Sequence, residues 1–144
     1  MFKIASVLGL IVMMVALVGL YAIGALITLQ PIAVTVQVLA VALMIWARAT
    51  FGSRSFHASA DPTEGGLVTA GPYHYIRHPI YTAACLFGWG AVATHLSVVG
   101  AVLGVALIAG GLIRVVCEER LLTLAYPGYV AYSKATKRLL PYVF

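Results

Sequence analysis

Residues 4–29 form a continuous stretch without a single charged side chain. A helix needs about 20 such residues to cross the hydrocarbon core of a bilayer. A secretory signal would have a shorter apolar region and a cleavage site of small residues, so we expect a retained membrane helix. The composition agrees, because 62% of the 144 residues are hydrophobic and only 9% are charged. The chain is therefore predicted to be an all-α integral membrane protein.

Three further apolar stretches follow the first, and residues that interrupt a helix separate them. Residues 32–47 come after the turn at Gln30 and Pro31, residues 79–94 begin with a proline, and residues 97–116 follow a short turn. Together with the first stretch they predict four transmembrane helices. Gln37 is the one strongly polar residue in the second stretch, and we expect it to form an interhelical hydrogen bond.

The C-terminal part is predicted to form an amphipathic helix that lies along the membrane surface. It starts after Pro127 and Gly128 and ends at Pro141, and one of its faces carries Tyr129, Tyr132, Thr136 and Leu139. We divide the chain into an N-terminal transmembrane hairpin, residues 1–50, and a C-terminal region, residues 51–144. The C-terminal region holds a polar loop, residues 51–70, the second hairpin and the C-terminal helix.

The distribution of charge predicts the orientation of the chain in the membrane. The turns at residues 30–31 and 94–97 contain none of the nine basic and four acidic residues. Basic residues favour the cytosolic side, so both termini and the polar loop are expected there. The net charge of +5 comes without a long basic run, which fits anionic lipid headgroups as partners and not nucleic acid.

The most polar segment next to an apolar stretch is residues 71–81, which holds two histidines, one arginine and three tyrosines. Arg77 and His78 precede the helix that Pro79 is expected to start, because proline is well tolerated in a first helical turn. Free N–H groups and the positive end of the helix dipole favour an anion at this place. Interfacial anchoring is the competing interpretation, since tyrosine, histidine and arginine are common at the ends of membrane helices.

The predicted topology brings this segment close to two glutamates. The third and fourth helices form an antiparallel hairpin whose turn lies on the far side, so Arg77 and His78 should lie near Glu118 and Glu119. A structural ion pair would need only one arginine and one glutamate. The additional histidines, tyrosines and second carboxylate favour a ligand site, open to the cytosol and to the bilayer.

No metal site is predicted from the sequence. His57, Asp61 and Glu64 lie in the polar loop, but their spacing matches no familiar set of metal ligands. Cys85 and Cys117 are isolated in apolar stretches, where cysteine behaves as a small apolar residue.

Two motifs carry a resemblance to a known family. Arg77-His78-Pro79-x-Tyr81, preceded by Gly71-Pro72-Tyr73, resembles the signature of the isoprenylcysteine carboxyl methyltransferase family and its phospholipid methyltransferase relatives. The second motif, Glu118-Glu119-x-x-Leu122, is followed by Tyr129-x-x-Tyr132 and Pro141 and is also similar to that family. The resemblance extends from about residue 67 to the C-terminus.

The resemblance implies a site for S-adenosylmethionine and a lipophilic acceptor from the bilayer, either an isoprenylcysteine-like carboxylate or a lipid. Arg77 and Glu119 would be the catalytic residues nearest the transferred methyl group. The residues that would bind the cofactor are Gly71, Tyr73, His78, Tyr81, Glu118, Glu119, Leu122, Tyr129 and Arg138. Ala83 and Ala135 replace a glycine and an arginine that the family often has, and Lys134 or Arg138 can substitute for that arginine.

Two other classes of protein fit part of this pattern. A membrane reductase of the steroid-reductase type has a similar Arg-x-Pro-x-Tyr stretch and uses NADPH, whose extra phosphates would call for more basic residues. A non-enzymatic membrane subunit would use the motifs only as interfacial anchors. Such a subunit would bind neither S-adenosylhomocysteine nor NADPH, so a comparison of the two ligands separates all three classes.

Overall fold

The computed structural model describes residues 1–52 and 66–141, and within these residues the chain is all-helical, without a β-strand. The prediction of an all-α protein is confirmed. The helices are α1 (Phe2–Ala22), α2 (Pro31–Phe51), the short 3-10 helix η2 (Gly71–His74), α3 (Pro79–Val92), α4 (Val98–Ala125) and α5 (Tyr129–Ala135).

Three helices of the described part, α1, α2 and α4, are long and apolar enough to cross a membrane. The apolar helix α3 has 14 residues, which corresponds to about 21 Å at 1.5 Å per residue. This is less than the thickness of the hydrocarbon core, about 30 Å. The fourth predicted span, at residues 79–94, therefore stays a prediction.

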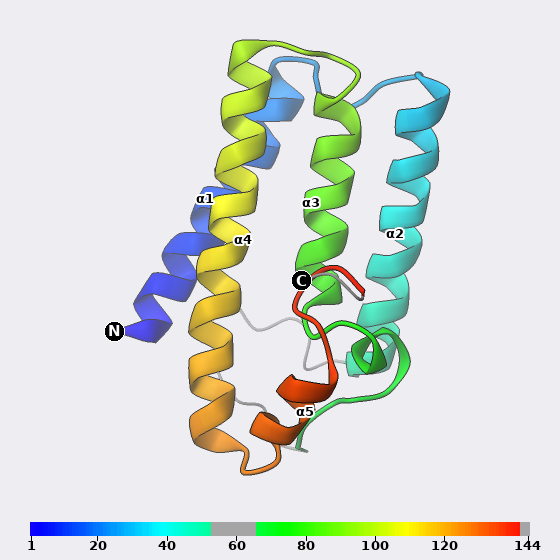
Figure 1. Cartoon of the computed structure of the whole chain (residues 1–144). Helices are drawn as coiled ribbons and strands as arrows, with labels where there is room; N and C mark the ends of the chain where they lie inside the picture. Colours follow the sequence, from blue (N-terminus) through cyan, green and yellow to red (C-terminus); the bar gives the residue numbers. More distant parts are fainter. Residues whose placement is uncertain (53–65, 142–144) are drawn as a thin grey trace.

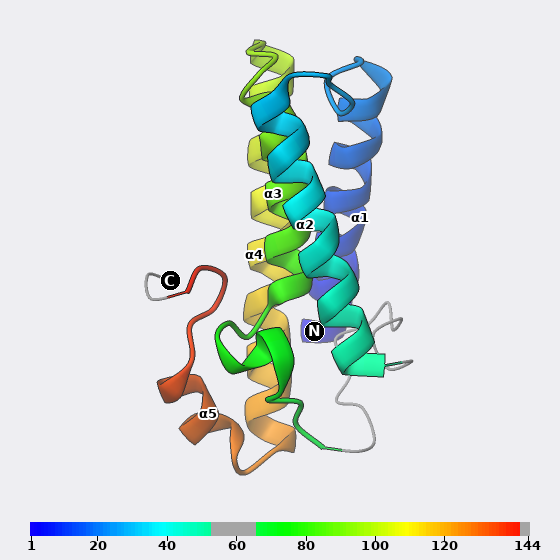
Figure 2. The same cartoon turned by 90° about the vertical axis from the view of Figure 1, so that its right-hand side faces the viewer.

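The long helices pack in two pairs, α1 with α4 and α2 with α3, and α3 also contacts α4 (Figures 1 and 2). The backbones of α1 and α4 lie close together at Gly9 and Gly110. A Cβ atom on Gly110 would lie 2.7 Å from the Gly9 carbonyl oxygen, so this crossing requires glycine. Each N-terminal helix thus packs on a helix of the second half. The division of the chain near residue 50 stays a prediction.

The connection between α1 and α2 begins earlier than the sequence suggests. Helix α1 ends at Ala22, and Gly24 has a φ of +69°, a left-handed conformation that glycine adopts without strain. Gln37 Nε2 donates a hydrogen bond to the Leu26 carbonyl at 2.7 Å and contacts the Phe87 carbonyl of α3 at 3.4 Å. The predicted interhelical role of Gln37 is confirmed.

The predicted C-terminal helix is wrong beyond Ala135. Helix α5 has seven residues, and Thr136 is already extended, with φ −126° and ψ 159°. The extended chain satisfies two N–H groups that precede α3: Arg77 N donates to the Lys137 carbonyl at 2.7 Å, and His78 N to the Arg138 carbonyl at 3.0 Å. These N–H groups cannot find acceptors within α3, because they precede its first turn.

The start of α3, the last turns of α4 and the C-terminal segment, residues 129–139, meet at one end of the bundle (Figure 1). The turn between α3 and α4 lies at the opposite end. His57, Asp61 and Glu64 of the predicted polar loop lie outside the described residues.

Candidate functional site

The site is centred on the two residues before α3 and the two glutamates near the end of α4. Arg77 Nε donates to Glu119 Oε1 at 2.9 Å across 42 positions of sequence. His78 Nδ1 lies 3.5 Å from Glu118 Oε2, and His78 Nε2 lies 3.5 Å from Glu119 Oε1. The predicted proximity of the two motifs is confirmed.

Tyr81 extends this cluster into the bundle, toward an arginine on α4. Its hydroxyl donates to Glu118 Oε1, and Arg114 Nε donates to the Tyr81 hydroxyl at 2.6 Å. Arg114 NH2 also donates to Glu118 Oε1, at 3.2 Å. The sequence analysis did not identify Arg114 as a site residue. Its spacing of four residues before Glu118, typical of a helical ion pair, was the signal that could have found it.

The C-terminal segment closes the other side of the cluster. Arg77 NH1 donates to the carbonyl of Ser133 at 2.7 Å and to the carbonyl of Thr136. Arg138 Nε donates to Glu119 Oε2 at 3.0 Å. Lys134 and Arg138 were the two predicted substitutes for the arginine missing at position 135, and the guanidinium of Arg138 contacts one of the predicted site carboxylates.

The centre of the cluster is largely removed from water. The side chain of His78 is 4% exposed and that of Glu119 is 14% exposed. Burial opposes protonation of His78, but hydrogen bonds and the charges of Glu118 and Glu119 prevail, so the pKa of His78 is raised above its ordinary value of 6.5. The site therefore favours a protonated imidazole between two carboxylates.

Two tyrosines of the C-terminal segment remain neutral phenols. Burial raises the pKa of Tyr132 to about 12, although the Arg77 charge opposes this change. Burial also raises the pKa of Tyr129, and the Glu119 charge acts in the same direction. Both side chains can donate a hydrogen bond through O–H.

Two site atoms are buried without a hydrogen bond within the described residues, His78 Nε2 and the Tyr129 hydroxyl, and His78 Nε2 has only the long contact with Glu119 Oε1 at 3.5 Å. Buried polar atoms almost always have a partner, so unpaired ones need an explanation. A bound polar molecule would supply partners for both atoms. The nearby carboxylates fit a molecule with an ammonium and a sulfonium group, because charge-assisted hydrogen bonds and ion pairs favour that combination.

Three predicted cofactor residues have other contacts in the structure. Gly71 has a φ of +57°, and a Cβ atom there would lie 2.6 Å from Thr50 Oγ1, so its glycine lets η2 pack against the end of α2. The ring of Tyr73 packs on Phe51 with centroids 5.4 Å apart. Leu122 is half-buried on α4, one turn beyond Glu118.

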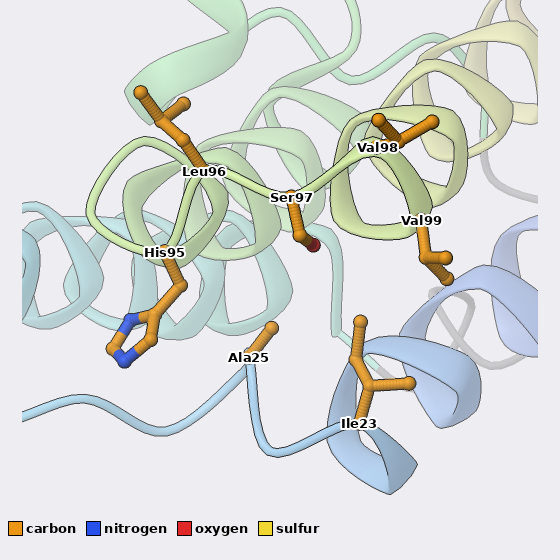
Figure 3. Close-up of a pocket in the computed structure, with 7 residues that line it drawn as sticks. All are labelled: Ile23, Ala25, His95, Leu96, Ser97, Val98 and Val99. Carbon is orange, nitrogen blue, oxygen red and sulfur yellow. The ribbon is translucent and has the colours of Figure 1, made fainter.

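A separate hollow of about 490 Å³ lies at the opposite end of the bundle, beside the turn between α3 and α4 (Figure 3). It is lined by Ile23, Ala25, His95, Leu96, Ser97, Val98 and Val99. These lining residues include no lysine, arginine, aspartate or glutamate. The Ser97 Oγ atom already accepts a hydrogen bond from Gly100 N at 3.0 Å. None of the predicted site residues lines this hollow.

The fold and the cluster define a helical membrane protein with a charged site at one end of its bundle. The model of the family described as phospholipid methyltransferase matches residues 29–128, more than half of the chain. The chain belongs to this family. Helix α1 precedes the matched residues.

One curated protein shows significant similarity to the chain. The cobalt-zinc-cadmium resistance protein CzcN of Cupriavidus metallidurans is 37% identical over 78 residues, which cover 52% of this chain and 35% of that protein. The aligned part thus spans about a third of the length of this relative. No solved structure matches the chain.

Proposed function

We propose that this protein transfers the methyl group of S-adenosylmethionine to a lipophilic acceptor that reaches the site from the bilayer. The observation that carries the proposal is the buried cluster of His78, Glu118 and Glu119 in a chain of a methyltransferase family. The cluster lies at one end of three helices that are long enough to cross a membrane, where a polar and an apolar substrate can meet.

The cofactor side of the proposed site consists of His78, Tyr81, Glu118 and Tyr129. Glu118 provides negative charge for the cofactor's ammonium group, and His78 Nε2 and the Tyr129 hydroxyl, which form no hydrogen bond within the described residues, provide polar contacts. When bound, S-adenosylmethionine supplies a methyl group attached to a positively charged sulfur. The sulfur becomes a neutral thioether when the methyl group is transferred. The protein then has to position the reactants and exclude water.

Glu119 is the proposed residue nearest the acceptor. Arg77 and Arg138 offset its negative charge, and Arg77 also positions it. The resemblance implied that Arg77 is a catalytic residue near the transferred methyl group. Its hydrogen bonds to Glu119, Ser133 and Thr136 support a positioning role instead. A guanidinium holds several acceptors in a fixed plane, which suits this role.

The contacts of both glutamates favour an acceptor that is already an anion. Glu118 receives hydrogen bonds from Tyr81 and Arg114, and Glu119 receives them from Arg77 and Arg138. Neither carboxylate is therefore placed as a free base. An amine acceptor would have to lose a proton, whereas a carboxylate acceptor would not. We propose a lipophilic carboxylate as the preferred acceptor class, with the site and both termini on the cytosolic side.

Isothermal titration of the purified protein in detergent with S-adenosylhomocysteine and with NADPH tests the proposal. We expect binding of S-adenosylhomocysteine alone, weakened by about 1–3 kcal/mol in His78→Ala and Tyr81→Phe, because each loses a buried polar contact. His95→Ala, at the other end of the bundle, is the matched control and should bind normally. Binding of NADPH would favour the reductase class, and binding of neither ligand would favour a non-enzymatic subunit.

A further inference from the structure

Arg114 is a charged residue buried among apolar side chains of α4. It is 4% exposed and lies in a helix that is long and apolar enough to cross a membrane. An arginine in such a place is costly unless its donors are paired, and it usually marks a functional site. Arg114 lies one helical turn before Glu118, so both side chains are on the same face of α4.

Within the part of the chain that the structure describes, the guanidinium of Arg114 donates in three directions. Nε donates to the Tyr81 hydroxyl at 2.6 Å and NH2 to Glu118 Oε1 at 3.2 Å, while Tyr81 donates to the same Glu118 oxygen. The three side chains therefore form a closed triangle. Because two donors hold Oε1 of Glu118, its Oε2 is directed toward His78, at 3.5 Å from Nδ1.

The third direction connects the cluster to the first helix. Arg114 NH1 donates to the carbonyl oxygen of Ser6, on α1, at 3.2 Å. This oxygen can accept a second hydrogen bond besides its bond within α1, because a carbonyl has two lone pairs. Gly9 makes room for the arginine: a Cβ atom there would lie 3.1 Å from Arg114 Cγ. Helix α1 lies outside the family match, yet it contributes a contact to the site.

We propose that Arg114 is a positioning residue, which fixes the orientation of Glu118 and Tyr81 for the cofactor and is itself held by α1. This inference rests on the proposed function, because it assigns Glu118 and Tyr81 to the cofactor. A lysine at position 114 would keep the positive charge. It could not reproduce the guanidinium plane that reaches Ser6, Tyr81 and Glu118 together.

The test compares Arg114→Lys and Arg114→Met with matched substitutions of Arg120, an exposed arginine of the same helix. The melting temperature and the Kd for S-adenosylhomocysteine are measured in detergent for every variant. We expect Arg114→Lys to have a melting temperature close to that of the wild type. It should bind S-adenosylhomocysteine roughly 10- to 100-fold more weakly, which corresponds to the loss of one to two polar contacts. Both Arg120 variants should bind like the wild type.

A double-mutant cycle of Arg114→Lys with Tyr81→Phe identifies the route of the effect. If Arg114 acts through Tyr81 and Glu118, the affinity of the double variant for S-adenosylhomocysteine should be only slightly lower than that of the single variant with the lower affinity. If the losses of binding free energy in the two single variants add up in the double variant, the inference is overturned. The cycle does not need Arg114→Met, which loses the charge and can fail to fold.

The outcomes separate this inference from the proposed function. A wild type that does not bind S-adenosylhomocysteine refutes the proposed function. A wild type that binds, together with an Arg114→Lys variant of unchanged affinity, refutes only the positioning role. A variant whose melting temperature and affinity fall in parallel would show that Arg114 is a structural strut, and this also overturns the inference.

Discussion

At the scale of single residues, two neighbouring tyrosines of α5 differ in the contacts of their hydroxyls. The rings of Tyr129 and Tyr132 pack edge to face, with centroids 6.0 Å apart. The Tyr132 hydroxyl donates to the Tyr73 carbonyl at 2.6 Å, whereas the Tyr129 hydroxyl is buried without a hydrogen bond to residues 1–52 or 66–141. The two phenols therefore allow a stabilising role to be separated from a ligand-binding role.

We expect Tyr129→Phe to retain or slightly increase the melting temperature, because it removes an unpaired buried hydroxyl. It should weaken the binding of S-adenosylhomocysteine by about 1–3 kcal/mol, since the ligand would lose that partner. Tyr132→Phe should instead lower the free energy of unfolding by about 1 kcal/mol. Thermal denaturation and titration calorimetry of both variants measure these effects. An unchanged affinity in Tyr129→Phe would remove Tyr129 from the site.

His78 should make the stability of the protein depend on pH. Its pKa in the folded state lies above the ordinary value of 6.5, because Glu118 and Glu119 outweigh the effect of burial. The protonated form of His78 therefore stabilises the folded state fully below about pH 6.5. This stabilisation is lost as the pH rises through the raised pKa. The melting temperature of the wild type should fall over this range.

The variant His78→Asn provides the control for this pH dependence. The other titratable groups next to His78 are Glu118, Glu119 and the stacked ring of Tyr81, at 5.9 Å between centroids, and the variant retains them. The difference in melting temperature between wild type and variant should therefore shrink as the pH rises. A difference that stays constant or grows with pH would contradict the protonated state inferred for His78.

At the scale of elements, Arg77 joins the start of α3 to the C-terminal segment. Its side chain donates to the carbonyls of Ser133 and Thr136, and its own N–H donates to the carbonyl of Lys137. Arg77→Lys would lose the planar guanidinium whose N–H groups bind both carbonyls and Glu119 at the same time. Trypsin should then cleave the variant at Lys134, Lys137 or Arg138 several-fold faster than the wild type, because the segment would open more often.

Arg120→Lys is the matched control for this experiment, because it makes the same exchange on the exposed side of α4. The cleavage rate of the control should equal that of the wild type. Mass spectrometry of the first products assigns the sites. If Arg77→Lys is cleaved as slowly as the wild type but loses methyl transfer, Arg77 contacts the acceptor and has no positioning role in the segment.

The sequence predicted the proximity of the two motifs better than it predicted the C-terminal segment. An antiparallel hairpin with a short turn brings Arg77 close to Glu119 whatever the packing of the other helices. The extended part after Ala135 depends on hydrogen bonds between Arg77 and Lys137 and between His78 and Arg138. Such long-range backbone pairing leaves no periodic pattern in the sequence, and the polar spacing of residues 129–139 favoured a continuous helix.

The packing partner of α1 could not be predicted for a similar reason. Both N-terminal helices are apolar on most sides, so no apolar stripe indicates which neighbour each one contacts. The contact of α1 with α4 depends on the facing glycines Gly9 and Gly110 and on the hydrogen bond from Arg114 to Ser6. Arg114 lies near the end of the predicted span at residues 97–116, and its burial against α1 became visible only in the structure.

At the scale of the whole molecule, the alternating directions of α1 to α4 give the bundle two chemically different ends. One end has the cluster of Arg77, His78 and the glutamates, while the other has the uncharged turns near Gln30 and His95 (Figure 1). Positive charge favours the cytosol, so the charged end is expected there. This orientation decides from which side a water-soluble cofactor reaches the site.

Single cysteines in a variant without Cys85 and Cys117 test this orientation. We expect Gln30→Cys and His95→Cys to react with a membrane-impermeant maleimide in intact cells, because the uncharged turns should face outward. Phe2→Cys and Ala131→Cys should react only after permeabilisation, and all four substitutions keep every lysine and arginine that sets the topology. Labelling of Ala131→Cys in intact cells would place the C-terminal segment outside. Because that segment contacts Arg77 and Glu119, the whole site would then lie outside, where a cytosolic cofactor could not reach it.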